Sequence, residues 1–125
     1  MHILLADDDE STATVARLGL RRAGFTVTVV DGGQAALRAA RETAFDALVL
    51  DWNMPDQAGV DVCRQLHADP AWARVPIVFL TGAMHEGAEQ EALAAGARGV
   101  IFKPFDPMTV GERVRAIIGT PNAER

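Results

Sequence analysis

The feature that most constrains the fold of this chain is an alternation of short apolar segments with longer amphipathic ones, repeated five times. The apolar segments are rich in valine, isoleucine and leucine, which is typical of strands buried on both faces of a parallel sheet. Five strand–helix units with right-handed crossovers predict a doubly wound α/β domain, a (βα)5 fold with a five-stranded parallel sheet. The predicted strands lie at about 2–6, 26–30, 46–51, 76–80 and 99–102, and the predicted helices at about 11–23, 33–43, 58–67, 86–95 and 107–118.

Size and composition limit the class of protein. The chain has 125 residues, 49% of them hydrophobic, which suits one globular domain. We expect no membrane span, because no apolar run approaches roughly 20 residues. We also expect no secretory signal, because the first residues carry no basic region followed by a long apolar segment and a small-residue cleavage site. The single cysteine, Cys63, fits a reducing compartment, so we expect a cytoplasmic protein, and the net charge of −5 argues against direct nucleic-acid binding. We expect the domain to cover 1–119, with 120–125 as a C-terminal tail or the start of a linker.

Individual residues predict local structure. Gly24 is expected to stop the first helix. Asp106 is expected to cap the fifth helix, with Pro107 in its first position. Trp72, in the loop after the third helix, is expected to cover a helix end, whereas Trp52 is expected to be partly exposed.

Polar residues of complementary chemistry stand at the carboxyl ends of four predicted strands. Asp7, Asp8 and Asp9 follow the first strand, Asp51 closes the third, Thr81 closes the fourth and Lys103 follows the fifth. In an open α/β sheet, the residues just past the carboxyl ends of the strands line the ligand crevice. Carboxylates, a hydroxyl and an ammonium group at one sheet edge predict a phosphate-handling site.

The carboxylates point to a metal ion. Asp7, Asp8 and Asp51 would converge at this edge if the first and third strands are neighbours. Like charges in close quarters repel one another, and a divalent cation relieves that repulsion. Mg²⁺ is the natural candidate, because it uses a few carboxylates, keeps several waters and accepts a phosphate oxygen. Taken alone, an acidic run at a strand–helix turn is more often a helix cap, so the prediction depends on the other strand ends.

Asp51 is the best candidate for a nucleophile. A carboxylate can attack a phosphoryl donor and form an aspartyl phosphate. Lys103 can neutralise charge on the transferring group, and Thr81 can donate a hydrogen bond to a phosphoryl oxygen. The chain has one lysine against eleven arginines, and the position of that lysine at this strand end favours a functional role.

Four segments together resemble the receiver domain of two-component response regulators, of the chemotaxis-regulator kind, across essentially all of residues 1–119. They are Ile-Leu-Leu-Ala-Asp-Asp-Asp at 3–9, Asp-Trp-Asn-Met-Pro at 51–55, Val-Phe-Leu-Thr-Gly at 78–82 and Ala-Gly-Ala-Arg-Gly-Val-Ile-Phe-Lys-Pro-Phe at 95–105. Each is weak alone, but all four occur in order and at the spacing of that family. The resemblance implies the flavodoxin-like strand order 2-1-3-4-5.

The resemblance also implies a role for each site residue. Asp51 would be the phosphoacceptor, and Thr81 and Lys103 would hold the phosphoryl oxygens. The Lys103–Pro104 peptide bond would be cis. The implied Mg²⁺ ligands are the carboxylates of Asp8 and Asp51, the backbone carbonyl of Asn53 and, through water, Asp7.

Two positions depart from the family pattern. The family usually carries Tyr or Phe three residues before the lysine, as a switch coupled to the threonine. Here that position is Val100, so the usual aromatic swing cannot occur. In addition, Ala58 precedes Gly59 where many relatives have an acidic residue, which is expected to alter loop capping.

The implied function is a phosphorylation-dependent signalling switch. The phosphoryl group would come from a histidine kinase or a phosphotransfer protein. A downstream protein target would bind the face formed by the fourth helix, fifth strand and fifth helix. Such a domain is not an enzyme beyond catalysing its own Mg²⁺-dependent phosphorylation and dephosphorylation.

Two alternatives remain open. Val100 favours a phospho-independent interaction module on the same fold, although the intact acidic set and Lys103 count against it. Residues 7–11 also fit the Asp-x-Asp-x-Ser start of haloacid-dehalogenase-type phosphatases, with Asp7 as nucleophile. That family needs paired acids after the lysine to complete its metal site, and room for a substrate cap, and the sequence offers neither.

Overall fold

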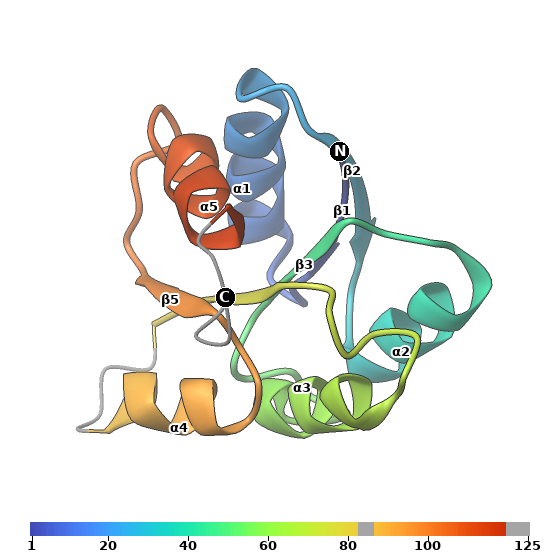
Figure 1. Ribbon diagram of the computed structural model, residues 1–125. Coiled ribbons are helices and arrows are strands. Elements are labelled where there is room, and N and C mark those ends of the chain that lie inside the picture. Colours follow the sequence, from blue (N-terminus) through green and yellow to red (C-terminus); the bar gives the residue numbers. More distant parts are fainter. Residues whose placement is uncertain (83–86, 120–125) are drawn as a thin grey trace.

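The computed structural model describes residues 1–82 and 87–119 and shows one parallel sheet between two layers of helices (Figure 1). The strands lie in the order β2-β1-β3-β4-β5, and neighbouring strands pair in parallel. The predicted fold class and the implied strand order are therefore confirmed. The elements are β1 His2–Ala6, α1 Glu10–Arg22, β2 Thr26–Val30, α2 Gly33–Glu42, β3 Ala47–Leu50, α3 Gly59–Ala68, β4 Ile77–Thr81, α4 Ala88–Ala94, β5 Gly99–Phe102 and α5 Val110–Ile118. The start predicted for the fourth helix, residue 86, and the tail at 120–125 lie outside the described residues.

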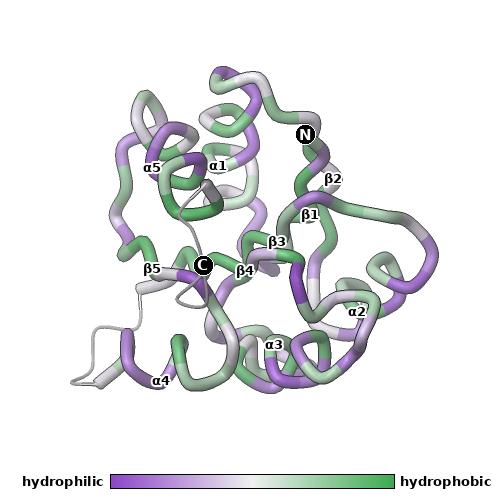
Figure 2. The backbone as a smooth tube through the Cα atoms, in the orientation of Figure 1, coloured by the Kyte–Doolittle hydropathy of each residue, from purple (hydrophilic) through white to green (hydrophobic). Residues whose placement is uncertain are grey.

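The sheet separates two hydrophobic cores. Successive side chains of a strand point to opposite faces, so Ile3 and Leu5 of β1 belong to one core and Leu4 belongs to the other. α1 and α5 cover the first face, and α2, α3 and α4 cover the second (Figure 1). The hydrophobic strand segments run between these layers (Figure 2). The central strand β3 is fully buried and contributes two residues to each core.

The N-terminal end of α1 lies beside the predicted site and is fixed by local capping. The carboxylate of Asp9 accepts hydrogen bonds from the backbone amides of Ser11 and Thr12, at 3.0 and 3.3 Å. At the other end, Gly24 follows the helix with φ of +96°, a left-handed conformation that glycine adopts at little cost. The predicted stop at Gly24 is confirmed.

The predicted start of the fifth helix was wrong by three residues. α5 begins at Val110, and Asp106 and Pro107 belong to a turn before it. The carboxylate of Asp106 accepts a hydrogen bond from the amide of Met108 at 2.8 Å, and its carbonyl accepts one from Thr109 at 3.0 Å. Asp106 therefore accepts amides two and three places further on, as a capping residue does, but residues 107–109 form a turn and the helix begins after it.

The prediction for Trp72 is confirmed. Its side chain is buried, and its indole N–H donates to the carbonyl oxygen of Ala40 at 3.1 Å. Ala40 lies in the last turn of α2, where carbonyl groups have no partner within the helix. Trp72 thus covers the C-terminal end of α2.

Candidate functional site

The pairing of β1 with β3 brings the predicted carboxylates together. In the register of this pair Ala6 lies opposite Leu50, so Asp7 and Asp51 are each the next residue after a paired position. The amide of Asp51 donates to the carbonyl of Ala6 at 2.9 Å, which ties the two strand ends to each other. Carboxylate oxygens of Asp7, Asp8 and Asp51 all lie within 4.8 Å of one another.

Lys103 joins this cluster from the other side. Its ammonium nitrogen Nζ lies 3.4 Å from Oδ2 of Asp7 and 3.4 Å from Oδ1 of Asp51. The two carboxylates are 3% and 8% exposed, so the ion pairs are largely shielded from solvent. The structure thus brings together four of the predicted site residues from three strand ends.

Backbone amides orient both buried carboxylates. Oδ1 of Asp7 accepts a hydrogen bond from the amide of Asp9 at 2.9 Å. Oδ1 of Asp51 accepts one from the amide of Trp52 at 2.8 Å. Each acid is therefore held by its own following turn, as well as by Lys103.

Burial and crowding act on the ionisation of Asp51. Burial raises the pKa of Asp51 above its ordinary 3.8, and the negative charge of Asp7 raises it further. The charge of Lys103 and the hydrogen bond from Trp52 oppose this rise in pKa without cancelling it. One ammonium group faces three carboxylates, so the cluster has an excess of negative charge. Oxygen ligands with excess negative charge suit Mg²⁺, so the residues present fit the predicted ion.

Thr81 and Lys103 lie at neighbouring strand ends. The carbonyl of Thr81 accepts a hydrogen bond from the amide of Lys103 at 2.7 Å, and the threonine is 1% exposed. The peptide bond from Lys103 to Pro104 is cis. Thr81 is therefore at the same sheet edge as the acidic cluster, and its role toward a phosphoryl group stays a prediction.

The prediction that Trp52 is partly exposed was wrong. Its side chain is 6% exposed, and its ring packs on Phe79 with 5.0 Å between ring centroids. Phe79 lies on β4 opposite Leu50, two residues before the tryptophan. The loop after Asp51 therefore turns back over the core formed by the sheet and α2, α3 and α4.

The two departures from the family pattern have structural counterparts. Val100 is 9% exposed and lies in β5 opposite Phe79, within the core on the α2, α3 and α4 side. Ala58 is the N-cap residue of α3 and supplies no side-chain cap. Asn53, the implied carbonyl ligand, is exposed in the loop that connects Asp51 to Gly59.

Asp56 is a residue that the sequence did not single out. Its carboxylate accepts hydrogen bonds from the backbone amides of Gly33 and Gln34, both at 3.0 Å. The signal that could have found it is Gly32, because a helix preceded by glycine has no side chain to cap itself. The sequence around Gly32, however, does not indicate which residue supplies the cap.

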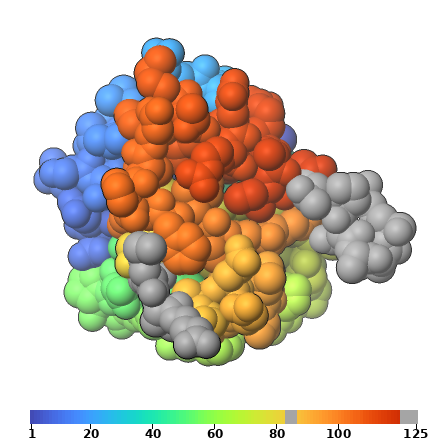
Figure 3. Space-filling model, turned by 90° about the vertical axis from the view of Figure 1, so that its left-hand side faces the viewer, coloured from blue at the N-terminus to red at the C-terminus, as the bar shows by residue number. Residues whose placement is uncertain are grey.

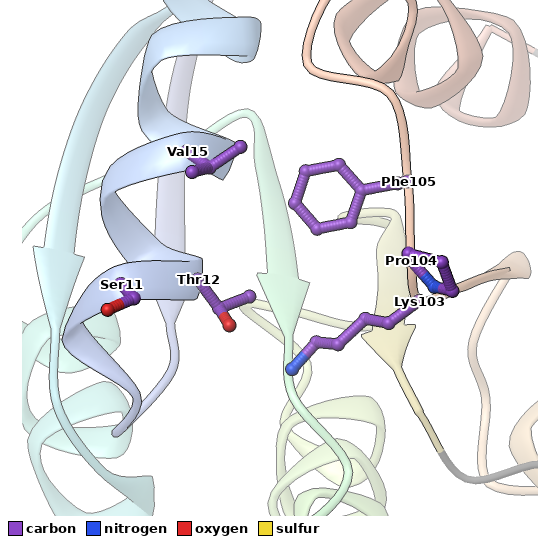
Figure 4. A pocket seen from close by; sticks show the side chains of 6 residues that line it. All are labelled: Ser11, Thr12, Val15, Lys103, Pro104 and Phe105. Atoms are coloured by element: carbon purple, nitrogen blue, oxygen red, sulfur yellow. The ribbon is translucent and has the colours of Figure 1, made fainter.

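Two hollows adjoin the cluster. One, of about 430 Å³, is lined by Ser11, Thr12, Val15, Lys103, Pro104 and Phe105. Figure 4 shows Val15 and Phe105 on opposite sides of it, with the Lys103 side chain extending below. The second, of about 450 Å³, is lined by Asp7, Asp8, Glu10, Ala13, Thr14, Arg17, Val29 and Asp31. A molecule that approaches the cluster therefore meets an apolar wall on one side and an acidic wall on the other.

The chain belongs to the response regulator receiver domain family, whose sequence profile it matches over residues 3–115. Receiver domains are signalling modules of two-component systems, and their general function is phosphorylation-dependent switching. The family whose profile matches is that of receiver domains, and not that of haloacid-dehalogenase-type phosphatases. Among the residues that the structure describes, no helix is long and apolar enough to cross a membrane.

Two curated relatives show how much of a full-length response regulator this chain corresponds to. The DNA-binding response regulator MtrA of Mycobacterium tuberculosis is 42% identical over 114 residues, which cover 91% of this chain and 49% of MtrA. The chemotaxis protein CheY of Pseudomonas aeruginosa is 34% identical over 123 residues, covering 98% of this chain and 99% of CheY. The chain thus spans about half the length of MtrA and nearly all of CheY.

A solved structure shares the fold of this chain. The receiver domain of sensor histidine kinase PA1611 from Pseudomonas aeruginosa aligns with a TM-score of 0.84 and 32% identity, over 95% of this chain and 98% of that one. That structure has a magnesium ion coordinated in its active site cleft.

Proposed function

We propose that Asp51 accepts a phosphoryl group from the phosphohistidine of a histidine kinase or a phosphotransfer protein, and that the reaction requires Mg²⁺. The observation that carries the proposal is the environment of Asp51. Its carboxylate is buried at a strand end, 3.4 Å from the ammonium group of Lys103 and close to two further carboxylates. A nucleophile, a cation and candidate metal ligands thus meet at one point.

In the proposed reaction, an oxygen of Asp51 attacks phosphorus and the bond from phosphorus to the imidazole nitrogen breaks. The electron pair of that bond stays on the imidazole, which leaves as the neutral ring. Lys103 stays protonated and neutralises charge on a transferring oxygen, and Thr81 donates its hydroxyl hydrogen to another. Asp8, Asp51 and the Asn53 carbonyl would hold Mg²⁺, with Asp7 acting through water. The bound ion would shield the charge that gathers on the phosphoryl oxygens.

The domain would transmit a signal and not turn over a substrate. It would catalyse only its own phosphorylation and dephosphorylation, in the cytoplasm. The receiver domain would comprise 1–119, with 120–125 as a tail or the start of a linker. The name of MtrA attributes DNA binding to a protein about twice as long. We propose that this domain itself does not contact nucleic acid, because its net charge is −5.

The proposed output surface is the face formed by α4, β5 and α5. These elements form one continuous face in the space-filling view, gold at α4 and orange to red at β5 and α5 (Figure 3). Phosphorylation would bias this face toward a form that binds a downstream protein. With Val100 in place of an aromatic residue, the coupling would run through the backbone link between Thr81 and Lys103.

The test is phosphorylation of the purified domain by acetyl phosphate and MgCl₂, followed by intact mass spectrometry. The wild type is expected to gain one phosphoryl group, and EDTA is expected to prevent this. Asp51→Asn is expected to stay unlabelled, whereas Asp61→Asn, which removes an exposed carboxylate in α3, is expected to label like the wild type. Labelling of Asp51→Asn would refute the assignment.

A phospho-independent interaction module is the second candidate, and Val100 is the observation that favours it. On this alternative, the α4, β5 and α5 face would bind its partner equally well with and without phosphate. Binding of the target by wild type and by Asp51→Asn, with and without acetyl phosphate, separates the two. Equal affinity in all four samples would favour the alternative.

A further inference from the structure

The loop that follows the phosphoacceptor is fastened to a helix distant in sequence. Asp56 lies five residues after Asp51, and its two carboxylate oxygens accept the backbone amides of Gly33 and Gln34, each at 3.0 Å. The N-cap residue of α2, Gly32, makes no side-chain cap bond. The first amides of a helix have no partner within it, so Asp56 supplies the missing cap from another part of the chain. The negative charge also suits the positive end of the helix dipole.

The contact is closely fitted on both sides. A Cβ atom placed on Gly32 would lie 3.0 Å from Oδ1 of Asp56, and one on Gly33 would lie 2.9 Å from Cβ of Gln57. The side chain of Gln34 also donates to that of Gln57, from Nε2 to Oε1 at 3.0 Å. The glycine pair thus allows the loop to approach the helix end, and two neighbouring side chains of the loop hold it there. We name this contact, made by Asp56 and Gln57 with residues 32–34, the α2 latch.

The same loop is closed at its base. The amide of Gly59 donates to the carbonyl of Trp52 at 2.7 Å. The ring of Trp52 is buried against Phe79, which fixes the first residue of the loop. Asn53 lies between this closed base and the latched tip at Asp56. Its backbone is therefore constrained from both ends, although its side chain is exposed.

We propose that Asp56 is a positioning residue for the metal site: through the α2 latch it holds the loop that presents the Asn53 carbonyl. This inference rests on the proposed function, because the Asn53 carbonyl is a metal ligand only there. Holding a ligand in its bound position removes the cost of ordering it when the ion arrives. Coupling between two sites is reciprocal, so Mg²⁺ must in turn stabilise the latch.

A purely structural role for Asp56 and a positioning role for the metal site predict different results. If Asp56 acted only on α2, removing it would loosen the helix end and lower stability, and the affinity for Mg²⁺ would stay the same. If it acts on the loop, the affinity for Mg²⁺ falls, and Mg²⁺ slows hydrogen exchange of the latched amides. Metal affinity and amide exchange together therefore separate the two roles.

The experiment titrates the full chain with MgCl₂ by isothermal titration calorimetry and follows the Gly33 and Gln34 amides by NMR hydrogen exchange, with and without the ion. The variant is Asp56→Ala and the matched control is Asp61→Ala. Both remove one exposed carboxylate and change the net charge from −5 by the same amount, so the two variants are matched in net charge. Gln57→Ala loosens the latch without changing charge.

We expect Asp56→Ala to bind Mg²⁺ about fivefold more weakly than Asp61→Ala, at the lower end of coupling between linked sites. Gln57→Ala is expected to fall between them. In the wild type, Mg²⁺ is expected to slow exchange of both latched amides, and in Asp56→Ala to leave them unchanged. Equal affinities of Asp56→Ala and Asp61→Ala would overturn the inference and leave the metal site standing. A wild type that bound no Mg²⁺ would overturn both.

Discussion

Substituting Gly59 by alanine tests how tightly the loop after Asp51 is packed. A Cβ atom on Gly59 would lie 2.1 Å from the carbonyl oxygen of Asp51 and 3.0 Å from Cε1 of Phe79. Ordinary contact begins at 3.4 Å, so the two atoms must separate by 3.4 − 2.1 = 1.3 Å. The atom that must give way is backbone, next to the proposed nucleophile, and no side-chain rotation relieves the clash.

The expected loss of stability follows from that overlap. Overpacking of a closely fitted site costs about 1–3 kcal/mol. Alanine loses less backbone entropy than glycine on folding, which offsets roughly 0.4–1 kcal/mol of this loss of stability. We therefore expect Gly59→Ala to lower the free energy of unfolding by about 1–2 kcal/mol. For a domain of this size that corresponds to a fall in Tm on the order of 3–10 °C.

Gly82→Ala is the matched control. A Cβ atom on Gly82 would meet no atom of the described residues within 4 Å, so this variant is expected to keep the entropic gain without the clash. Urea unfolding, followed by circular dichroism, is expected to show Gly82→Ala at least as stable as the wild type and Gly59→Ala clearly less stable. If Gly59→Ala were as stable as Gly82→Ala, the loop would not be packed as described and the argument would fail.

Three further predictions concern the site and the core. Lys103→Met is expected to slow phosphorylation by acetyl phosphate about 100-fold, because one preorganised cation is lost; an unchanged time course by mass spectrometry would contradict this. Burial raises the pKa of Asp51 above 3.8, so at a pH above 3.8 the native state holds more protons on this carboxyl than the unfolded chain does. The free energy of unfolding therefore falls as the pH rises above 3.8 and through the pKa of the folded state. Asp51→Asn in EDTA is therefore expected to be more stable than the wild type at neutral pH, with the difference vanishing below pH 3.8, as urea unfolding at several pH values would show. Burial raises the pKa of the Cys63 thiol to about 12, so the native protein is expected to resist alkylation by iodoacetamide; rapid labelling without unfolding would refute its burial.

The strand ends could be predicted because apolar runs mark them to within about a residue. The third strand was expected at 46–51 and is Ala47–Leu50, so Asp51 still falls at its end. Parallel strands place their carboxyl ends at one edge, which is why Asp7, Asp51 and Lys103 were expected together and lie together. The residues alone left the pairing of the first and third strands conditional, and the strand order came from the resemblance.

Two of the features that the sequence did not predict depend on contacts between residues that are distant along the chain. The burial of Trp52 depends on Phe79, which lies on another strand. The cap that Asp56 provides joins residues 23 and 22 positions apart. The start of α5 was misplaced for a local reason: Asp106 accepts the amide of Met108 as a cap does, but residues 107–109 form a turn and the helix begins at Val110.

The central strand β3 has a consequence for how the domain unfolds. Its four residues are 0% exposed and serve both hydrophobic cores in alternation. Loss of either layer of helices would therefore expose two side chains of β3 and leave the strand packed on one face only. The two cores form one cooperative unit, so damage on the α1 and α5 face and damage on the α2, α3 and α4 face lower the same unfolding transition. Asp51, the proposed phosphoacceptor, is one residue beyond this strand and keeps its position for as long as the whole domain remains folded.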